Sequence, residues 1–209
     1  MTYAEQLEQF LTTTFAVFAT QSGDTAQRLG EALVTVGQPA AEPLPASVPA
    51  CAWLKQAITD PHRKHRDLLW SVAQLAPVLP WLEVPPGMLP PAFYGRHAYT
   101  EVVGPDGAPM PSKVVRVGLY LQAPETDYPA HAHDAEELYL VLSGWAHWNA
   151  GPRRFIAEPG QVIRHAPEES HAMRTGEAPF LALWAWLGAI NGDYWLIDGP
   201  HWPAAYPVA

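Results

Sequence analysis

Apolar residues in the first third of the chain recur at three- and four-residue steps, which is the spacing of one face of an α-helix. The first such face carries Leu7, Phe10, Leu11, Phe15 and Phe18. A second helix, for which Ser22 or Asp24 offers an N-cap, carries Leu29, Leu33 and Val36. Two amphipathic helices are therefore predicted at the start of the chain.

A connector rich in proline and alanine, residues 37–50, separates these helices from further helical segments. A short helical piece is predicted around Trp53, Leu54 and Ile58. Pro61 is predicted to open another helix, with Leu68, Leu69, Val72 and Leu75 on one side. Prolines between positions 77 and 91 then end the helical pattern, because proline lacks the backbone N–H that a helix interior needs.

From Ala92 onward the pattern changes to short β segments separated by turns. Examples are YTEVVG, KVVRVGLYLQ, ELYLVLSG and FLALWAWLG. Regularly spaced short strands without a long helix between them favour a sandwich or barrel. We therefore expect a mainly β fold in which residues 1–90 form a helical region packed on a β-barrel of residues 91–209.

The strand segment at residues 131–144 reads HAHDAEELYLVLSG. Alternate side chains of a strand share one face. One face of this segment therefore carries His131, His133, Glu137 and Tyr139. The other face carries Leu138, Leu140 and Leu142, which are expected to pack outside the barrel wall. Two histidines, a glutamate and a tyrosine in register are unusual on a merely solvated face.

A second segment, residues 159–171, reads PGQVIRHAPEESH and adds another imidazole to this picture. A Pro-Gly turn begins a short strand, and a turn at Ala166 and Pro167 precedes His171. Three imidazoles and one carboxylate suit one borderline divalent metal such as Zn, Fe, Mn, Co or Ni. Two open coordination positions would admit a bidentate substrate or water.

Composition and charge narrow the classes of partner. The formal net charge is −9, and the 12 Lys and Arg form no basic cluster, so nucleic acid and anionic membranes are poor candidates. The single cysteine excludes an intramolecular disulfide and a zinc site built from several thiolates. The apolar stretch at residues 10–19 lacks the positive flank of a signal peptide, and no apolar run approaches a membrane span. We expect a cytoplasmic protein.

The pattern HxHxxxExxxxxxG, from His131 to Gly144, resembles the first motif of the cupin superfamily. The glycine that this motif has six residues before its first histidine is Glu125 here. The second cupin motif is matched more loosely, because Ala166, Glu168 and Thr175 replace its proline, glycine and asparagine. Spacing from Gly160 favours His171 over the nearby His165 as the last ligand. The resemblance covers about residues 110–190 and implies a cupin β-barrel.

Tyr139 distinguishes this chain among cupins, because a phenol beside a divalent cation has a lowered pKa and can act as a general base. The pattern HxHxxxExY, with Tyr128 before it, resembles the cupin dimethylsulfoniopropionate lyases, and most of all their DddQ branch. The resemblance implies metal ligands at His131, His133, Glu137 and His171, a base at Tyr139 and a second active-site tyrosine at Tyr128. It also implies a pocket tryptophan at Trp186.

The implied reaction is elimination of dimethyl sulfide from a small zwitterionic sulfonium, leaving acrylate. Aromatic faces tolerate a sulfonium cation, and Tyr128, Trp184 and Trp186 are the candidates for binding it. Simple core packing of the tryptophans is the alternative. Other reaction classes stay open at this point: a dioxygenase or isomerase with the same ligands, or a binding module without catalysis. A monomer and a homodimer are equally compatible with the sequence.

Overall fold

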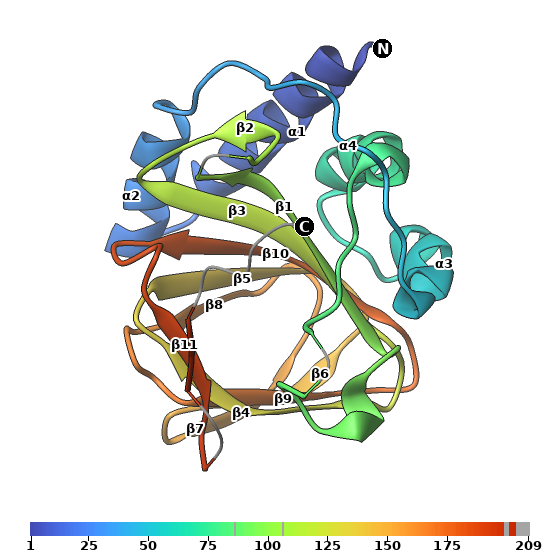
Figure 1. The fold of residues 1–209 in the computed structure, drawn as a ribbon, viewed down its shortest axis with the longest axis vertical. Helices are drawn as coiled ribbons and strands as arrows, with labels where there is room; N and C mark the ends of the chain where they lie inside the picture. The colour runs from blue at the N-terminus through green and yellow to red at the C-terminus, as the bar shows by residue number, and fades with distance from the viewer. Residues whose placement is uncertain (86, 106, 199–200, 204–209) are drawn as a thin grey trace.

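Helices come first and strands follow in the computed structural model, which describes residues 1–85, 87–105, 107–198 and 201–203 (Figure 1). The α-helices are α1 (Tyr3–Phe18), α2 (Asp24–Leu33), α3 (Leu54–Thr59) and α4 (Arg66–Leu75). Short 3₁₀ turns are η1 (Pro49–Trp53), η2 (Ala76–Val78) and η3 (Pro91–Phe93). Among the described helices, none is both long and apolar enough to cross a membrane.

The strands build two six-stranded sheets that face one another. One sheet has the order β2 (Met110–Pro111), β1 (His97–Gly104), β3 (Val115–Gln122), β10 (Phe180–Leu187), β5 (Glu136–Ser143) and β8 (Val162–His165). The other has the order β12 (His201–Pro203), β11 (Asp193–Leu196), β4 (Asp127–His133), β9 (His171–Thr175), β6 (Ala146–Ala150) and β7 (Arg153–Ala157). The expected fold class, a mainly β barrel preceded by helices, is confirmed.

The helix boundaries differ in two places from those predicted. Neither Ser22 nor Asp24 caps α2, because the N-cap is Gly23 at φ 116°, and Asp24 instead pairs with Arg28 at 2.8 Å. Pro61 does not open α4, which begins at Arg66. The chain before it turns, and His65 has the left-handed conformation at φ 53°, which delays the start of the helix.

The helices cover the outer side of the first sheet (Figure 1). One apolar cluster joins Leu7, Phe10, Leu29, Leu68 and Leu75 of the helices to Leu119, Leu138, Leu140, Leu142 and Leu183 of the strands. The prediction that the leucines of β5 pack outside the wall is confirmed. The division of the chain at residue 90 stays a prediction about domain organisation.

An ion cluster around the buried Glu136 links α2 to the strand that carries Glu137. The Glu136 carboxylate at the start of β5 accepts hydrogen bonds from Thr25 at 2.6 Å, from Arg164 at 2.6 Å and from Arg28. Burial acts to raise the pKa of Glu136, but these donors lower it on balance. The backbone that presents the next residue, Glu137, is thereby held against the helical layer.

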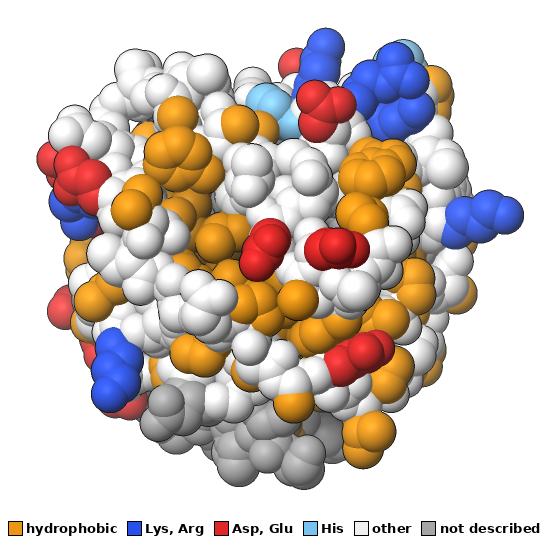
Figure 2. All heavy atoms as spheres, turned by 90° about the horizontal axis from the view of Figure 1, so that it is seen from above, with side chains coloured by type: hydrophobic (Ala, Val, Ile, Leu, Met, Phe, Trp, Pro, Cys, Tyr) orange, Lys and Arg blue, Asp and Glu red, His pale blue; other side chains and the backbone are white. Residues whose placement is uncertain are grey.

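The view from above shows one outer face of the molecule (Figure 2). Apolar side chains on this face are interrupted by acidic ones, and the basic side chains lie mainly toward the rim. The pattern agrees with the negative net charge of the chain. This face has no broad positive surface of the kind that nucleic acid requires.

Candidate metal centre

The candidate centre forms where the two sheets meet at a tight connection. Strand β4 ends at His133 in one sheet, and β5 begins at Glu136 in the other, with only Asp134 and Ala135 between them. His171 at the start of β9 lies opposite His131 of β4 in the strand register. Residues that are distant in sequence are thus brought to one end of the barrel interior.

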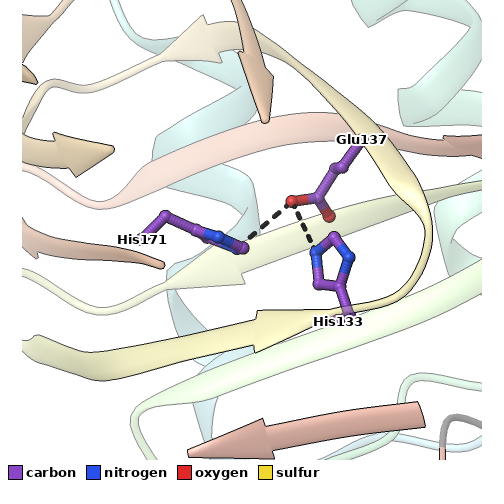
Figure 3. A group of neighbouring side chains, drawn as sticks. All are labelled: His133, Glu137 and His171. Carbon is purple, nitrogen blue, oxygen red and sulfur yellow. Dashed lines mark hydrogen bonds and ion pairs between the residues drawn. The ribbon is translucent and has the colours of Figure 1, made fainter. Parts of the chain in front are cut away.

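Three of the four predicted ligands form a compact buried group (Figure 3). The ligand atoms of His133, Glu137 and His171 all lie within 4.8 Å of one another. Oε2 of Glu137 is 3.2 Å from Nε2 of His133 and 3.3 Å from Nε2 of His171. None of the three side chains is more than 4% exposed.

Backbone carbonyls fix the orientation of the imidazoles. Nδ1 of His131, His133 and His171 lies 2.8, 2.9 and 2.8 Å from the carbonyl oxygens of Pro129, Ala135 and Glu169. A carbonyl oxygen only accepts, so Nδ1 of each ring donates, and in the neutral tautomer that this fixes the lone pair lies on Nε2. Such outer contacts are the usual way in which proteins orient metal-binding histidines.

His171 shows that these residues fit a cation. Its Nε2 is buried and has no hydrogen-bond partner. A buried polar atom left without a partner is costly, and a cation would satisfy it. Imidazole nitrogens with a carboxylate are a donor set that suits borderline divalent ions such as Zn or Fe. The buried histidine and glutamate cluster therefore fits a metal site.

His131 lies beside this group rather than within it. Its ring centroid is 4.0 Å from that of His171 and 6.5 Å from that of His133. Burial, followed by the neighbouring His171, lowers the pKa of His131 well below its usual value, so the ring is neutral. A neutral imidazole is the form that binds metals.

Two N–H groups outside the predicted ligand set donate to the Glu137 carboxylate. The indole N–H of Trp186 donates to Oε1 at 2.8 Å, and Nδ1 of His165 lies 2.8 Å from Oε2. Burial acts to raise the pKa of Glu137, but His133 above all, together with the N–H of His165, lowers it well below its usual range. The carboxylate is therefore ionised and fixed in place.

The two predicted tyrosines lie in different surroundings. Tyr139 is 4% exposed, and its ring meets those of Trp148 and His165 edge-on. Burial, and then the charge of Glu137, raise the pKa of Tyr139 well above its usual value. Tyr128 instead stacks on His131, with ring centroids 4.1 Å apart, and its hydroxyl lies 3.3 Å from that of Tyr194.

Aromatic side chains enclose the same interior. The rings of Trp184 and Trp186 meet at 5.9 Å, and Trp184 is the cross-strand neighbour of Tyr139. The Trp186 ring lies 4.5 Å from that of His133. Sequence patterns alone did not predict the contributions of Phe93, Tyr120 and Tyr194, which come from three separate elements and pack around Tyr128.

The family model for dimethylsulfoniopropionate lyases matches residues 21–182, well over half of the chain. The chain belongs to the dimethylsulfoniopropionate lyase family. It is therefore a carbon–sulfur lyase by family. A protein of Cereibacter sphaeroides with the provisional name dimethylsulfoniopropionate lyase DddL is 32% identical over 76% of this chain and 68% of that protein. The dimethylsulfoniopropionate lyase DddQ of Ruegeria pomeroyi is 34% identical over 47% of this chain. The match spans 49% of DddQ, about half of its length.

Solved structures match over almost the whole fold. A crystal structure from work on the lyases RdDddP and RnDddQII has a TM-score of 0.79 and covers 94% of this chain and 100% of its own, at 23% identity. The structure of DddQ from Ruegeria pomeroyi has a TM-score of 0.78 and covers 93% of this chain and 98% of its own, also at 23% identity. The expected cupin barrel with preceding helices is confirmed.

Proposed function

We propose that this chain is a metal-dependent lyase that cleaves dimethylsulfoniopropionate to dimethyl sulfide and acrylate by a β-elimination that Tyr139 initiates. Family membership supports the substrate and the reaction. The buried cluster of His133, Glu137 and His171 supports the metal dependence. The observation that carries the proposal is this cluster on the inner side of the barrel, with Tyr139 two residues after Glu137 on the same face of β5.

We assign one divalent ion, Zn, Fe, Mn, Co or Ni, to His131, His133, Glu137 and His171. The four side chains are buried, and the three imidazoles are oriented by backbone carbonyls, which leaves Nε2 of each available for the ion. When bound, the ion stabilises the negative charge that develops as the carbon next to the substrate carboxylate loses its proton.

Tyr139 takes that proton on its phenolate oxygen. The electron pair of the C–H bond forms the new carbon–carbon double bond, and the pair of the carbon–sulfur bond leaves with sulfur as neutral dimethyl sulfide. Acrylate remains, and the reaction needs neither oxidant nor reductant. Burial raises the pKa of Tyr139, so its phenolate depends on a positive charge beside it.

The aromatic interior is suited to the cationic end of the substrate. The faces of Trp184 and Trp186 attract a sulfonium through their ring electrons. The ring of Tyr128 lies between those of His131 and Phe93, at centroid distances of 4.1 and 4.9 Å, which holds it for positioning substrate. A cytoplasmic location and a monomeric or homodimeric state stay predictions.

The experiment that tests this function is a headspace assay for dimethyl sulfide with purified, metal-loaded protein. Tyr139→Phe keeps the ring and removes only the hydroxyl. Metal content should be unchanged, while elimination falls by roughly the 10²–10⁴-fold that a lost general base costs. Tyr128→Phe should cost less, because that residue positions substrate rather than taking the proton.

Two outcomes would count against the proposal. Protein that holds stoichiometric metal but releases no dimethyl sulfide is not this lyase, and belongs to another reaction class or to a binding module. Near-normal turnover in metal-loaded Tyr139→Phe would remove Tyr139 from the mechanism and make Tyr128 the first alternative base.

A further inference from the structure

The carboxylate of Glu137 has a support that does not belong to the ligand set. His165 of β8 is the direct cross-strand neighbour of Glu137 on β5, and its Nδ1 lies 2.8 Å from Oε2. On its far side, Nε2 of His165 lies 3.0 Å from the indole nitrogen of Trp148. Trp148 comes from β6 in the opposite sheet, so His165 links the carboxylate of its own sheet to a residue of the other.

Hydrogen-bonding rules decide which atom donates and which accepts in the contacts from Trp148 to His165 and from His165 to Glu137. An indole N–H only donates, so Nε2 of His165 accepts and carries no proton. The proton of the neutral ring therefore sits on Nδ1 and is donated to Glu137. His165 and Trp148 are 0% and 1% exposed, so water does not compete for either contact.

His165 and His171 use their ring nitrogens differently, although their rings are stacked with centroids 3.8 Å apart and an interplanar angle of 13°. His171 uses Nδ1 on a backbone carbonyl and leaves Nε2 without a hydrogen-bond partner. His165 has both nitrogens engaged, one by Trp148 and one by Glu137. Of the two adjacent imidazoles, only His171 has a lone pair free for a cation.

We propose that His165, fixed in one tautomer by Trp148, is a positioning residue that orients Glu137 toward the cation and is not itself a metal ligand. This inference rests on the metal dependence in the proposed function. Together with the indole N–H of Trp186 on Oε1, the His165 donor removes the freedom of the carboxylate to rotate. A carboxylate already turned toward the cation loses less entropy when the ion binds.

The test is a titration of the metal-free full-length protein with Co²⁺ alone, followed by its visible absorption spectrum and by a competing chelator. His165→Leu removes both contacts and should weaken Co²⁺ binding by about 10- to 100-fold, the range for lost outer partners, while one ion still binds at saturation with the wild-type spectrum. His165→Asn can still donate to Glu137 and should recover part of the affinity. Trp148→Phe keeps a ring but frees the tautomer of His165, and should give a smaller loss.

The controls separate this role from others. His147→Leu changes an exposed histidine on the same strand as Trp148 and should leave Co²⁺ affinity unchanged. His171→Ala lacks a predicted ligand, so any Co²⁺ that it still binds at high concentration should give a changed spectrum. Circular dichroism of each metal-free variant shows whether it is folded before titration.

Three results would overturn the inference. If His165→Leu binds Co²⁺ as tightly as wild type, His165 does not position the carboxylate. If it alters the spectrum as His171→Ala does, with no recovery in His165→Asn, His165 is a ligand. If wild type itself binds no Co²⁺, the metal dependence fails and the positioning role fails with it. Should His165→Leu be unfolded, equal affinity in wild type, His165→Asn and Trp148→Phe would be decisive against it.

Discussion

The wall formed by β3, β10 and β5 is buried on both faces, yet the two faces are chemically different. Along β10, Leu183 and Leu187 face the helices, whereas Trp184 and Trp186 face the barrel interior. Along β5, Leu140 belongs to the helix-covered side and Tyr139 to the interior. β10 is apolar along its whole length, yet one of its faces packs against the helices and the other lines the barrel interior.

The difference shows what each face requires of its residues. The outer face is held by apolar contact, which has no preferred direction and depends mainly on area and volume. The inner face carries polar atoms that each need one particular partner, such as the two N–H groups on Glu137. Substitutions on the outer face should therefore change stability, and those on the inner face should change chemistry.

The largest effect is expected from removing a ligand on the inner face. His133→Ala and His171→Ala should each lose the bound divalent ion and most turnover. The loss should be at least about 10³-fold, since the ion contributes several kcal/mol to the transition state. Elemental analysis of purified protein measures the metal, and His62→Ala, at an exposed histidine far from the barrel strands in sequence, is the matched control. Full occupancy in both ligand variants would disprove the site.

An intermediate effect is expected from the outer face. Leu140→Ala leaves a cavity between β5 and the helices and should lower the free energy of unfolding by about 2–5 kcal/mol. Metal content and turnover per folded molecule should stay near those of wild type. Urea unfolding measures the loss, and Ile156→Ala, at a side chain 49% exposed on β7, should change stability by less than about 0.5 kcal/mol. A turnover defect in folded Leu140→Ala would contradict the prediction that the outer face affects stability and not chemistry.

Local periodicity was enough to predict most of the wall. A two-residue repeat assigns Leu138 and Leu140 to one face and Tyr139 to the other, whatever the rest of the chain does. The three- and four-residue repeat of apolar residues predicted the helical segments in the same way. It did not predict where α2 and α4 begin, because the cap at Gly23 and the left-handed His65 depend on how the connecting backbone turns.

The site was predictable only in part for the same reason. The spacing of His131, His133 and Glu137 lies within one segment, but His171 reaches them through the pairing of β4 with β9. The bonds from Trp186 and His165 to Glu137 cross between strands that are distant in sequence. Such contacts depend on register and on the approach of two sheets, which no spacing within a segment specifies.

The smallest expected effect is a dependence of the free energy of unfolding on pH, which a buried histidine causes and a buried leucine does not. His97 at the start of β1 is 1% exposed, with its Nε2 accepting the backbone N–H of Val84 and its ring stacked on Phe93. Burial lowers the pKa of His97 to about 4, although the hydrogen bond between its Nδ1 and the backbone carbonyl of Phe93 opposes the shift. In the unfolded chain the usual value is about 6.5. Between these values the unfolded state binds more protons, so His97 costs stability as pH falls from 6.5 toward 4, by about 3 kcal/mol at most.

His97→Gln should reveal how much stability the wild type loses at low pH because of His97. Near pH 7.5 the variant should be less stable than wild type, because a buried acceptor and a ring contact are lost. The gap should narrow as pH falls to about 4.5, since glutamine has no proton to gain on unfolding. Urea unfolding of both metal-free proteins at several pH values measures the gap, and the other histidines cancel in the difference. For Leu140→Ala the corresponding gap should not change with pH, because no charge is involved. A pH-independent gap for His97→Gln would mean that His97 titrates alike in the folded and unfolded chain.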